Sequence, residues 1–339
     1  MDAGRGQRGV ETWSSPAFLG DVTAWIDEVL GERGSERTGD AELSRVRHWG
    51  AIVRASSSEG TVWLKAPADA TLFELGIYDV LAGAAPERIL EPLAIDHERG
   101  WVLLPDGGEP VGDRLSGDER VAAMVAAMPR YAELQIALIP HADELVALGV
   151  DDMRAARMPA RFDQAVDAIR ERFGPETPDS DRAGLERIEA ERDNYAALCS
   201  ELEQAPVPAS LDHNDLHHEN VIFGPGGDAA EARFYDWGDA VVAHPFSSLL
   251  MARFNAADDP ARIEQLRDAY LEPFSGFGTH AELVAAVELA CRVGKVARAL
   301  TWLRATTAIR PGDDSRGYFR RAPLESLSGV LDAEWHGRT

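Results

Sequence analysis

The stretch of sequence at residues 211–240 decides the fold, and it reads LDHNDLHHENVIFGPGGDAAEARFYDWGDA. Two short apolar pieces in it, residues 221–223 and 233–235, have the character of β-strands. The residues between them, 224–228, are rich in glycine and include a proline, which is typical of a turn. The pattern therefore predicts a β-hairpin centred near Asp228.

A hairpin with this centre places Asn220 directly opposite Asp236 at its open end. Directly opposed residues have Cβ atoms ~4.5–5.5 Å apart. An amide oxygen and a carboxylate at that separation can share a hard cation such as Mg²⁺. Asp215 lies five residues before Asn220, in the loop that leads to the same end. We therefore expect three oxygen-bearing side chains to converge there.

This order of residues is the one that phosphoryl transfer from ATP requires, with one Asp to accept the acceptor's proton and an Asn and a second Asp to hold Mg²⁺. The pattern His213-x-Asp215-x4-Asn220, followed by Asp-Trp-Gly at 236–238, resembles the catalytic core of the aminoglycoside phosphotransferase family. The resemblance runs from about residue 13 to about residue 330. It implies that Asp215 is the catalytic base, that Asn220 and Asp236 are metal ligands, and that ATP and Mg²⁺ are the cofactors.

The same resemblance assigns two residues before the hairpin to phosphate binding. Lys65 ends an expected strand at 61–64 and is one of only two lysines among 34 basic residues. A compact ammonium at the end of a strand suits a phosphate contact. Glu74 lies nine residues later, in a helix expected over 70–81, and in the family an acid at this place anchors the lysine. For the other lysine, Lys295, replacement by arginine is expected to be silent.

The segment at 101–108 resembles the strand and hinge that join the two lobes of such enzymes. Backbone groups around Leu104 and Asp106 would then contact adenine. The chain also departs from the family pattern: Asn214 stands where the family usually has glycine, which is mild because asparagine tolerates left-handed φ. An acid that often precedes a Leu-rich helix is missing from residues 244–249.

These patterns predict an α+β, two-lobed, protein-kinase-like fold, with a small β-rich N-terminal lobe and a larger, mainly helical C-terminal lobe. We expect an N-terminal extension with one helix at 1–40, a small ATP-binding lobe and hinge at 41–110, and a catalytic and substrate-binding lobe at 111–339. The expected strands are 43–49, 51–55, 61–64, 89–95 and 101–104. The expected long helices are 118–138, 153–173, 181–203, 246–255, 260–271 and 280–307.

Composition limits the partners. The formal net charge of −24 and the lack of a basic cluster argue against nucleic acid and against an anionic membrane surface. No apolar run approaches the ~18 residues needed to span a bilayer. Two cysteines fit a reducing cytoplasm. No protein partner is evident, and the expected partner is a small molecule with a hydroxyl group.

The leading hypothesis is an ATP- and Mg²⁺-dependent phosphotransferase acting on a small-molecule hydroxyl. The resemblance and the acidic large lobe favour an aminoglycoside, an amino sugar or a related sugar or alcohol as acceptor. One alternative is a catalytically weak, nucleotide-binding pseudokinase. Another is a metal-dependent hydrolase that uses the cluster of His213, His217, His218 and nearby Asp residues. His213 is expected to brace its loop through a backbone hydrogen bond, and His217 and His218 to be exposed to solvent.

Overall fold

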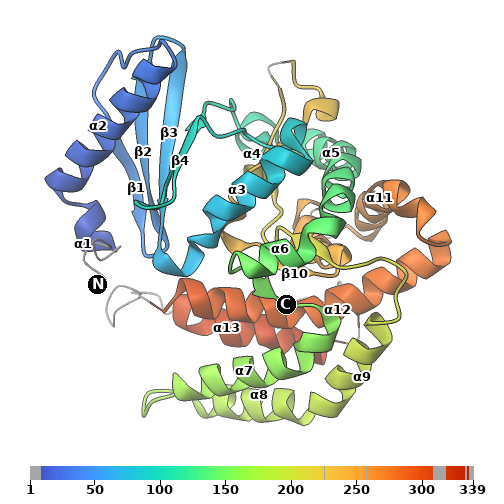
Figure 1. Cartoon of the computed structure of the whole chain (residues 1–339). Helices are drawn as coiled ribbons and strands as arrows, with labels where there is room; N and C mark the ends of the chain where they lie inside the picture. Colours follow the sequence, from blue (N-terminus) through green and yellow to red (C-terminus); the bar gives the residue numbers. More distant parts are fainter. Residues whose placement is uncertain (1–8, 225, 257–258, 308–317, 333, 336–339) are drawn as a thin grey trace.

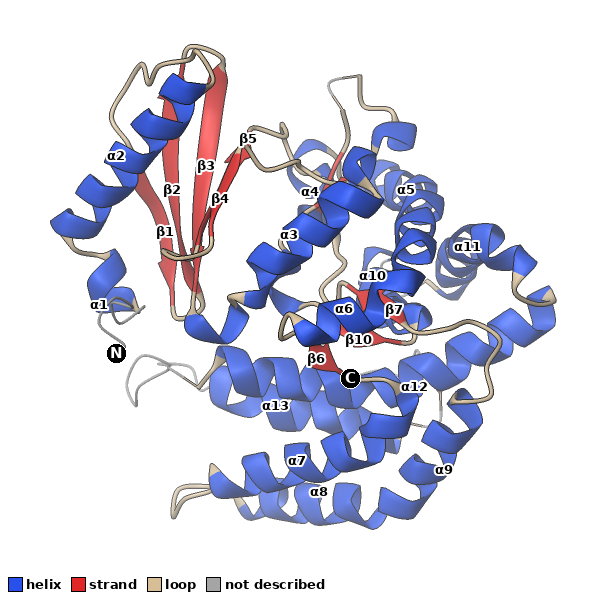
Figure 2. Ribbon diagram, in the orientation of Figure 1, coloured by secondary structure: helices blue, strands red, loops and turns tan. Residues whose placement is uncertain are grey.

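The computed structural model describes residues 9–224, 226–256, 259–307, 318–332 and 334–335. A five-stranded sheet with its helices forms one part of the molecule, and a larger, mostly helical part forms the other (Figures 1 and 2). This is the two-lobed α+β architecture that the sequence predicts. No helix in these described ranges is long and apolar enough to cross a membrane.

The small lobe is built on an antiparallel sheet with the strand order β1-β2-β3-β5-β4. The strands are β1 (Glu42–Arg47), β2 (Gly50–Ser57), β3 (Gly60–Pro67), β4 (Ala94–Asp96) and β5 (Trp101–Pro105). Four of the expected strands are confirmed with slightly different ends. The expected strand at 89–95 is largely wrong, because only its last two residues belong to β4.

Helices cover both faces of this sheet. After a single turn, α1 (Val10–Trp13), the helix α2 (Pro16–Glu32) begins with a side-chain cap from Ser15 and packs its buried face on the sheet (Figure 1). The alternation of β3 sends Leu64 and Ala66 into this shared core. The domain boundary near residue 40 stays a prediction, although α2 and the sheet have a common core.

The opposite face of the sheet packs against α3 (Phe73–Ala84), which follows a 3₁₀ turn at Asp69–Thr71. Ile77 and Leu81 of α3 share a core with Val102 and Leu104 of β5. Lys65 pairs with Val102 across the sheet, so its side chain emerges on this second face. The alternation of β3 therefore turns the lysine toward α3 and the large lobe.

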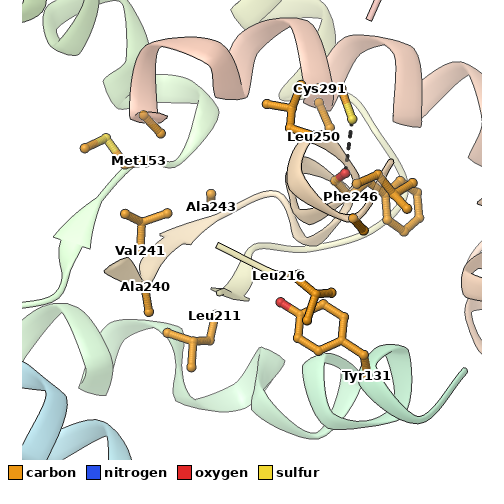
Figure 3. Close-up of a cluster of buried hydrophobic side chains, with 14 of the residues drawn as sticks. Tyr131, Met153, Leu211, Leu216, Ala240, Val241, Ala243, Phe246, Leu250 and Cys291 are labelled. Carbon is orange, nitrogen blue, oxygen red and sulfur yellow. Dashed lines mark hydrogen bonds between the residues drawn. The ribbon is translucent and has the colours of Figure 1, made fainter. Parts of the chain in front are cut away.

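The large lobe contains the remaining helices, which surround one continuous core. They are α4 (Val111–Arg114), α5 (Gly117–Leu138), α6 (Ala142–Ala147), α7 (Met158–Glu171), α8 (Asp179–Ala190), α9 (Arg192–Leu202), α10 (Leu249–Ala252), α11 (Pro260–Leu271), α12 (His280–Ala305) and α13 (Tyr318–Ser328). The expected helix 181–203 is interrupted at Glu191, so α8 and α9 can both turn apolar residues inward. Figure 3 shows part of this core, where Cys291 of α12 donates to the carbonyl of Phe246 at 3.3 Å.

Short strands hold the functional loops, and only the pair in the hairpin was predicted from the sequence. β10 (Val241–Ala243) lies between β6 (Asp151–Asp152) and β7 (Ser210–Asp212), and β8 (Val221–Ile222) pairs with β9 (Arg233–Phe234). Strands of two or three residues are too short to show an alternating pattern, which is why sequence reasoning missed β6, β7 and β10.

Lys295 lies in a buried position, where replacement by arginine is no longer expected to be silent. Its side chain is buried within α12, and its Nζ donates to the carbonyl of Gly329 at 2.8 Å and to the carboxylate of Asp332 at 3.2 Å. Position 295 therefore fastens the segment that follows α13 to the central helix of the large lobe.

Candidate active site

The hairpin that organises the site has a register one residue away from the predicted one. Val221 pairs with Phe234, and the next pair outward joins Asn220 to Tyr235, whose amide donates to the Asn220 carbonyl at 3.3 Å. The prediction that Asn220 lies opposite Asp236 is therefore wrong. Asp236 follows the strand in a left-handed conformation with φ of 65°, which re-aims the chain at this point.

The predicted lysine and acid meet Asp236 at one point. The Nζ of Lys65 lies 2.6 Å from Oε1 of Glu74 and 2.6 Å from Oδ1 of Asp236. Glu74 is fully buried, whereas 44% of the Asp236 side chain is exposed, so the cluster opens toward solvent on the Asp236 side. Helix α3, strand β3 and the end of β9 each contribute one of the three charges.

The charges in this cluster stabilise one another. Desolvation alone would lower the pKa of Lys65, but Asp236 and Glu74 outweigh it and raise that pKa, so the lysine stays a cation. Desolvation would raise the pKa of Asp236, but Lys65 lowers it to about 2. Burial raises the pKa of Glu74. The cluster therefore presents an ionised, partly exposed carboxylate beside a fixed ammonium.

The residues after Asp236 are held by the same acid. The amide of Trp237 donates to Oε1 of Glu74 at 3.1 Å, and the buried indole of Trp237 lies 4.6 Å from the ring of His213, centroid to centroid. Nε2 of His213 donates to the carbonyl of Tyr235 at 2.9 Å, since a carbonyl can only accept. The expectation that His213 braces the loop through backbone is confirmed.

Asp215 lies in a loop between β7 and the 3₁₀ turn His218–Asn220. Asn214 before it has φ of 58°, the left-handed conformation that asparagine tolerates. His217 lies 3.3 Å from Oδ2 of Asp215, and Arg298 lies 3.5 Å from Oδ1. Desolvation would raise the pKa of Asp215, but His217 and Arg298 outweigh it and lower that pKa, so the carboxylate is ionised and able to accept a proton.

Two of these neighbours were not identified from the sequence. His217 was expected in solvent, but it contacts Asp215 and accepts from the amide of Glu219 at 3.2 Å. Arg298 of α12 donates to the carbonyl of Asn214 and lies 3.5 Å from Oδ2 of Asp239. Nothing local marks an arginine so far along the chain, in a sequence where almost every basic residue is arginine.

Asn220 is buried beside the same loop, and its orientation is fixed. Its Nδ2 donates to the Asp215 carbonyl at 2.9 Å, which leaves the amide oxygen as its acceptor atom. Asn220 and Asp236 thus offer hard oxygen atoms, the donor type that suits Mg²⁺. No group of three His, Cys, Asp or Glu side chains among the described residues is arranged to hold a metal.

The predicted hinge lies at the end of β5. Leu104 is buried and pairs with Trp63 in the sheet, while Asp106 is exposed. The amide of Asp106 already donates to the carbonyl of Thr61 at 3.1 Å, and its carboxylate accepts from the amide of Gly108 at 3.1 Å. Any contact between this segment and the adenine of a bound nucleotide therefore has to use backbone groups other than the Asp106 amide.

Comparison with solved structures places the fold among known proteins. A macrolide 2′-phosphotransferase type I aligns with a TM-score of 0.56 and 16% identity, over 90% of this chain and 96% of that one. A choline kinase from Streptococcus pneumoniae aligns with a TM-score of 0.60 and 13% identity, over 92% and 99%. A GDP complex of an aminoglycoside 2′-phosphotransferase aligns with a TM-score of 0.56 and 14% identity, over 91% and 97%.

Comparison by sequence gave a different result. No family model matches the chain, and no curated protein sequence matches it. The agreement is therefore in architecture, and it extends over nearly the whole of each compared chain. The chain has the two-lobed, protein-kinase-like fold of the macrolide and aminoglycoside phosphotransferases and the choline kinases.

Proposed function

We propose that this protein transfers the γ-phosphoryl group of ATP, with Mg²⁺, to a hydroxyl group of a small molecule. The observation that carries the proposal is the meeting of Lys65, Glu74 and Asp236 at 2.6 Å contacts in a fold shared with phosphotransferases and kinases. Nucleotide binding is supported by related structures described as complexes with ADP, GDP and AMP.

In this proposal each charged group has a separate task. Glu74 holds Lys65, whose ammonium binds the phosphates, and backbone groups near Leu104 and Asp106 contact the base. Asp236 and Asn220 would hold Mg²⁺, which supplies charge neutralisation on the phosphates when bound. Positioning and charge stabilisation account for most of the catalysis in such reactions.

Asp215 acts on the acceptor. Its carboxylate accepts the proton of the acceptor hydroxyl as the oxygen bonds to the γ-phosphorus, while the bond from that phosphorus to the β–γ bridging oxygen breaks and ADP leaves. Arg298 and His217 contact its two oxygens and keep it ionised. The base is therefore ready at neutral pH without a further proton transfer.

The acceptor that we propose is an aminoglycoside, an amino sugar or a related sugar or alcohol. The net charge of −24 favours a cationic or neutral compound over an anionic one. The same charge disfavours binding to nucleic acid or to an anionic membrane, and the two cysteines fit a protein that works in a reducing cytoplasm. A nucleotide-binding pseudokinase remains the alternative, and turnover decides between the two.

The test is ADP release with a panel of hydroxyl compounds, comprising aminoglycosides, amino sugars, neutral sugars and amino alcohols. We expect at least one acceptor to raise ADP release above the rate with ATP and Mg²⁺ alone, and mass spectrometry to show a phosphate on that acceptor. Nucleotide binding with no turnover on any compound would favour the pseudokinase.

The metal ligands are tested by nucleotide binding. Asp236→Ala should abolish the Mg²⁺-dependent part of ATP binding, and Asn220→Ala should weaken it. Asp228→Ala, at the far end of the same hairpin, is the control and should bind as the parent does. Unchanged Mg²⁺ dependence in both site variants would remove the metal site from the proposal.

A further inference from the structure

The loop that carries Asp215 rests on a buried carboxylate that the proposed reaction does not use. Asp212, the last residue of β7, is 1% exposed. Its Oδ1 accepts from the amide of Asn214 at 2.8 Å and from the hydroxyl of Ser248. Ser248 is fully buried and lies directly before α10. It follows Asp212 by 36 residues in the sequence.

The direction of every hydrogen bond in this group follows from the carboxylate. An ionised Asp212 can only accept, so Ser248 gives its one proton to Asp212. Tyr131 must then donate to Ser248, with 2.8 Å between the two oxygens. The hydroxyl oxygen of Tyr131 is left to accept from the amide of His213, at 2.9 Å. The amide of Asn214 thus bonds directly to the Asp212 carboxylate. The amide of His213 is connected to the same carboxylate through the hydroxyls of Tyr131 and Ser248.

These two amides immediately precede Asp215. Asn214 is in the left-handed conformation, which a residue other than glycine holds only when its surroundings determine it. The amides are buried, and leaving one without an acceptor costs the full desolvation of that group. The Asp212 network therefore determines how the chain enters the loop and where the Asp215 carboxylate lies.

Ser248 also occupies the place where the sequence resemblance leads us to expect an acid, just before the Leu-rich helix. The acid is present in space but is supplied from the other side, by β7. The carboxylate of Asp212 and the hydroxyl of Ser248 face each other at this place.

We propose that Asp212 is a positioning residue for Asp215, and that the Asp212–Ser248 pair can be exchanged without loss of that role. This inference rests on the proposed function for its effect on turnover. Its structural part, the restraint of the amides at 213 and 214, is independent of any activity.

The experiment compares Asp212→Ser, Ser248→Asp and the double variant that exchanges the two residues. Asp212→Ser removes the carboxylate that accepts from the Asn214 amide and from the Ser248 hydroxyl, and Ser248→Asp puts two carboxylates together. We expect each single variant to lower kcat by about 10²-fold, as ~1 Å misplacement of a reacting group does, with nucleotide affinity nearly unchanged. The double variant should recover most of the lost kcat.

Hydrogen exchange of the peptide that covers residues 210–216 is the second measurement. Exchange should speed up in Asp212→Ser and return toward the parent rate in the double variant. Ser247→Ala is the matched control, because this neighbouring buried serine bonds to the carbonyl of Ala290 and not to the loop. If Asp212→Ser does not fold, Asp212→Leu takes its place, because leucine is similar in shape, suits a buried strand position and has no acceptor oxygen.

Three results would count against the inference. They are native kcat in the folded Asp212 variant, unchanged exchange at 210–216, or a folded double variant no better than the single ones. If the parent has no phosphotransferase activity, the proposed function fails, and the exchange measurement still decides whether Asp212 restrains the loop.

Discussion

The two lysines of this chain lie in two different kinds of buried environment. Lys65 contacts Glu74 and Asp236, two carboxylates from separate elements, at the boundary of the two lobes. Lys295 is held by one carboxylate, that of Asp332, and by backbone carbonyls within the large lobe. Both were retained in a chain whose other basic residues are all arginine.

The difference lies in what surrounds the charge. Two carboxylates raise the pKa of Lys65 above its usual value, whereas burial lowers that of Lys295 despite Asp332. Beside Lys65, the partly exposed carboxylate of Asp236 is open to a ligand. Lys295 instead contacts the Asp332 carboxylate and backbone carbonyls of the large lobe. Both lysines therefore lie in spaces that suit a slim ammonium group. The charged groups around each lysine, and their exposure, indicate whether it can bind a ligand.

The largest expected effect is in the candidate active site that contains Lys65, at Asp215. Asp215→Asn removes the proton acceptor but keeps the shape, so turnover should fall by at least ~10²-fold while ATP binding is kept. ADP release and nucleotide titration measure the two quantities. A variant that phosphorylates its acceptor at nearly the native rate would show that Asp215 is not the base.

Lys65→Arg tests whether the ammonium group of Lys65 positions the phosphates of the nucleotide. The planar guanidinium is longer and directed differently, so it should displace either the phosphates or the helix that bears Glu74. We expect a loss of activity of about 10²-fold with little change in melting temperature. Native activity in this variant would return Lys65 to a structural role and would weaken the proposed function as a whole.

Lys295→Arg is the counterpart in the large lobe, with the opposite pattern. A Cβ at Gly329 would lie 3.0 Å from the Cδ of Lys295, so the space has no room for a bulkier group. Overpacking of this kind costs about 1–3 kcal/mol, so the melting temperature should fall while kcat per folded molecule stays the same. Equal melting temperatures for parent and variant would mean that the space around residue 295 accommodates a guanidinium after all.

His244 extends the comparison of buried basic groups, because no carboxylate among the described residues bonds to it. Nδ1 accepts from the amide of Phe246 at 3.3 Å, and Nε2 has no hydrogen-bond partner among the described residues. Burial lowers the pKa of His244 to about 3, against about 6.5 in an unfolded chain. Between these two values the unfolded chain binds a proton that the folded chain does not, so stability falls as the pH falls.

This linkage predicts a loss of about 2 kcal/mol from His244 between pH 7.5 and pH 5. His244→Asn keeps an acceptor for the Phe246 amide but cannot take up the proton, so its stability should depend less on pH by that amount. Asp212, whose pKa burial raises to about 6, acts in the reverse sense but is present in both proteins and cancels. Parallel pH profiles from urea unfolding would show that His244 is not neutral in the folded state.

Much of the fold could be predicted because its signals are local. The alternation in β3, the periodicity of α5, α11 and α12, and the turn between β8 and β9 are each written in consecutive residues. The predicted pairing of Lys65 with Glu74 is confirmed as a contact for the same reason, since a strand end and the next helix restrict where nine residues can lead. Roles in catalysis stay predictions until activity is measured.

The hairpin register shows where local signals stop. A turn with several glycines allows more than one centre, and a shift of one residue exchanges the two faces of a strand. Asp236 still reaches Lys65 because Asp236 itself has a left-handed backbone conformation, which changes the direction of the chain just after the strand. The sequence therefore identified the right residue through a geometry that was wrong by one position.

By itself the sequence determined the α+β order of elements, the residues that carry charge at the end of the hairpin, and the lysine with its acid. Tertiary structure alone decided that Arg298 and His217 flank Asp215, that Asp212 contacts Ser248, and that Lys295 is buried. These contacts join residues tens of positions apart, or depend on which way a short loop turns. Neither periodicity nor spacing records such pairings, because they arise only when separate helices and strands pack around a common core.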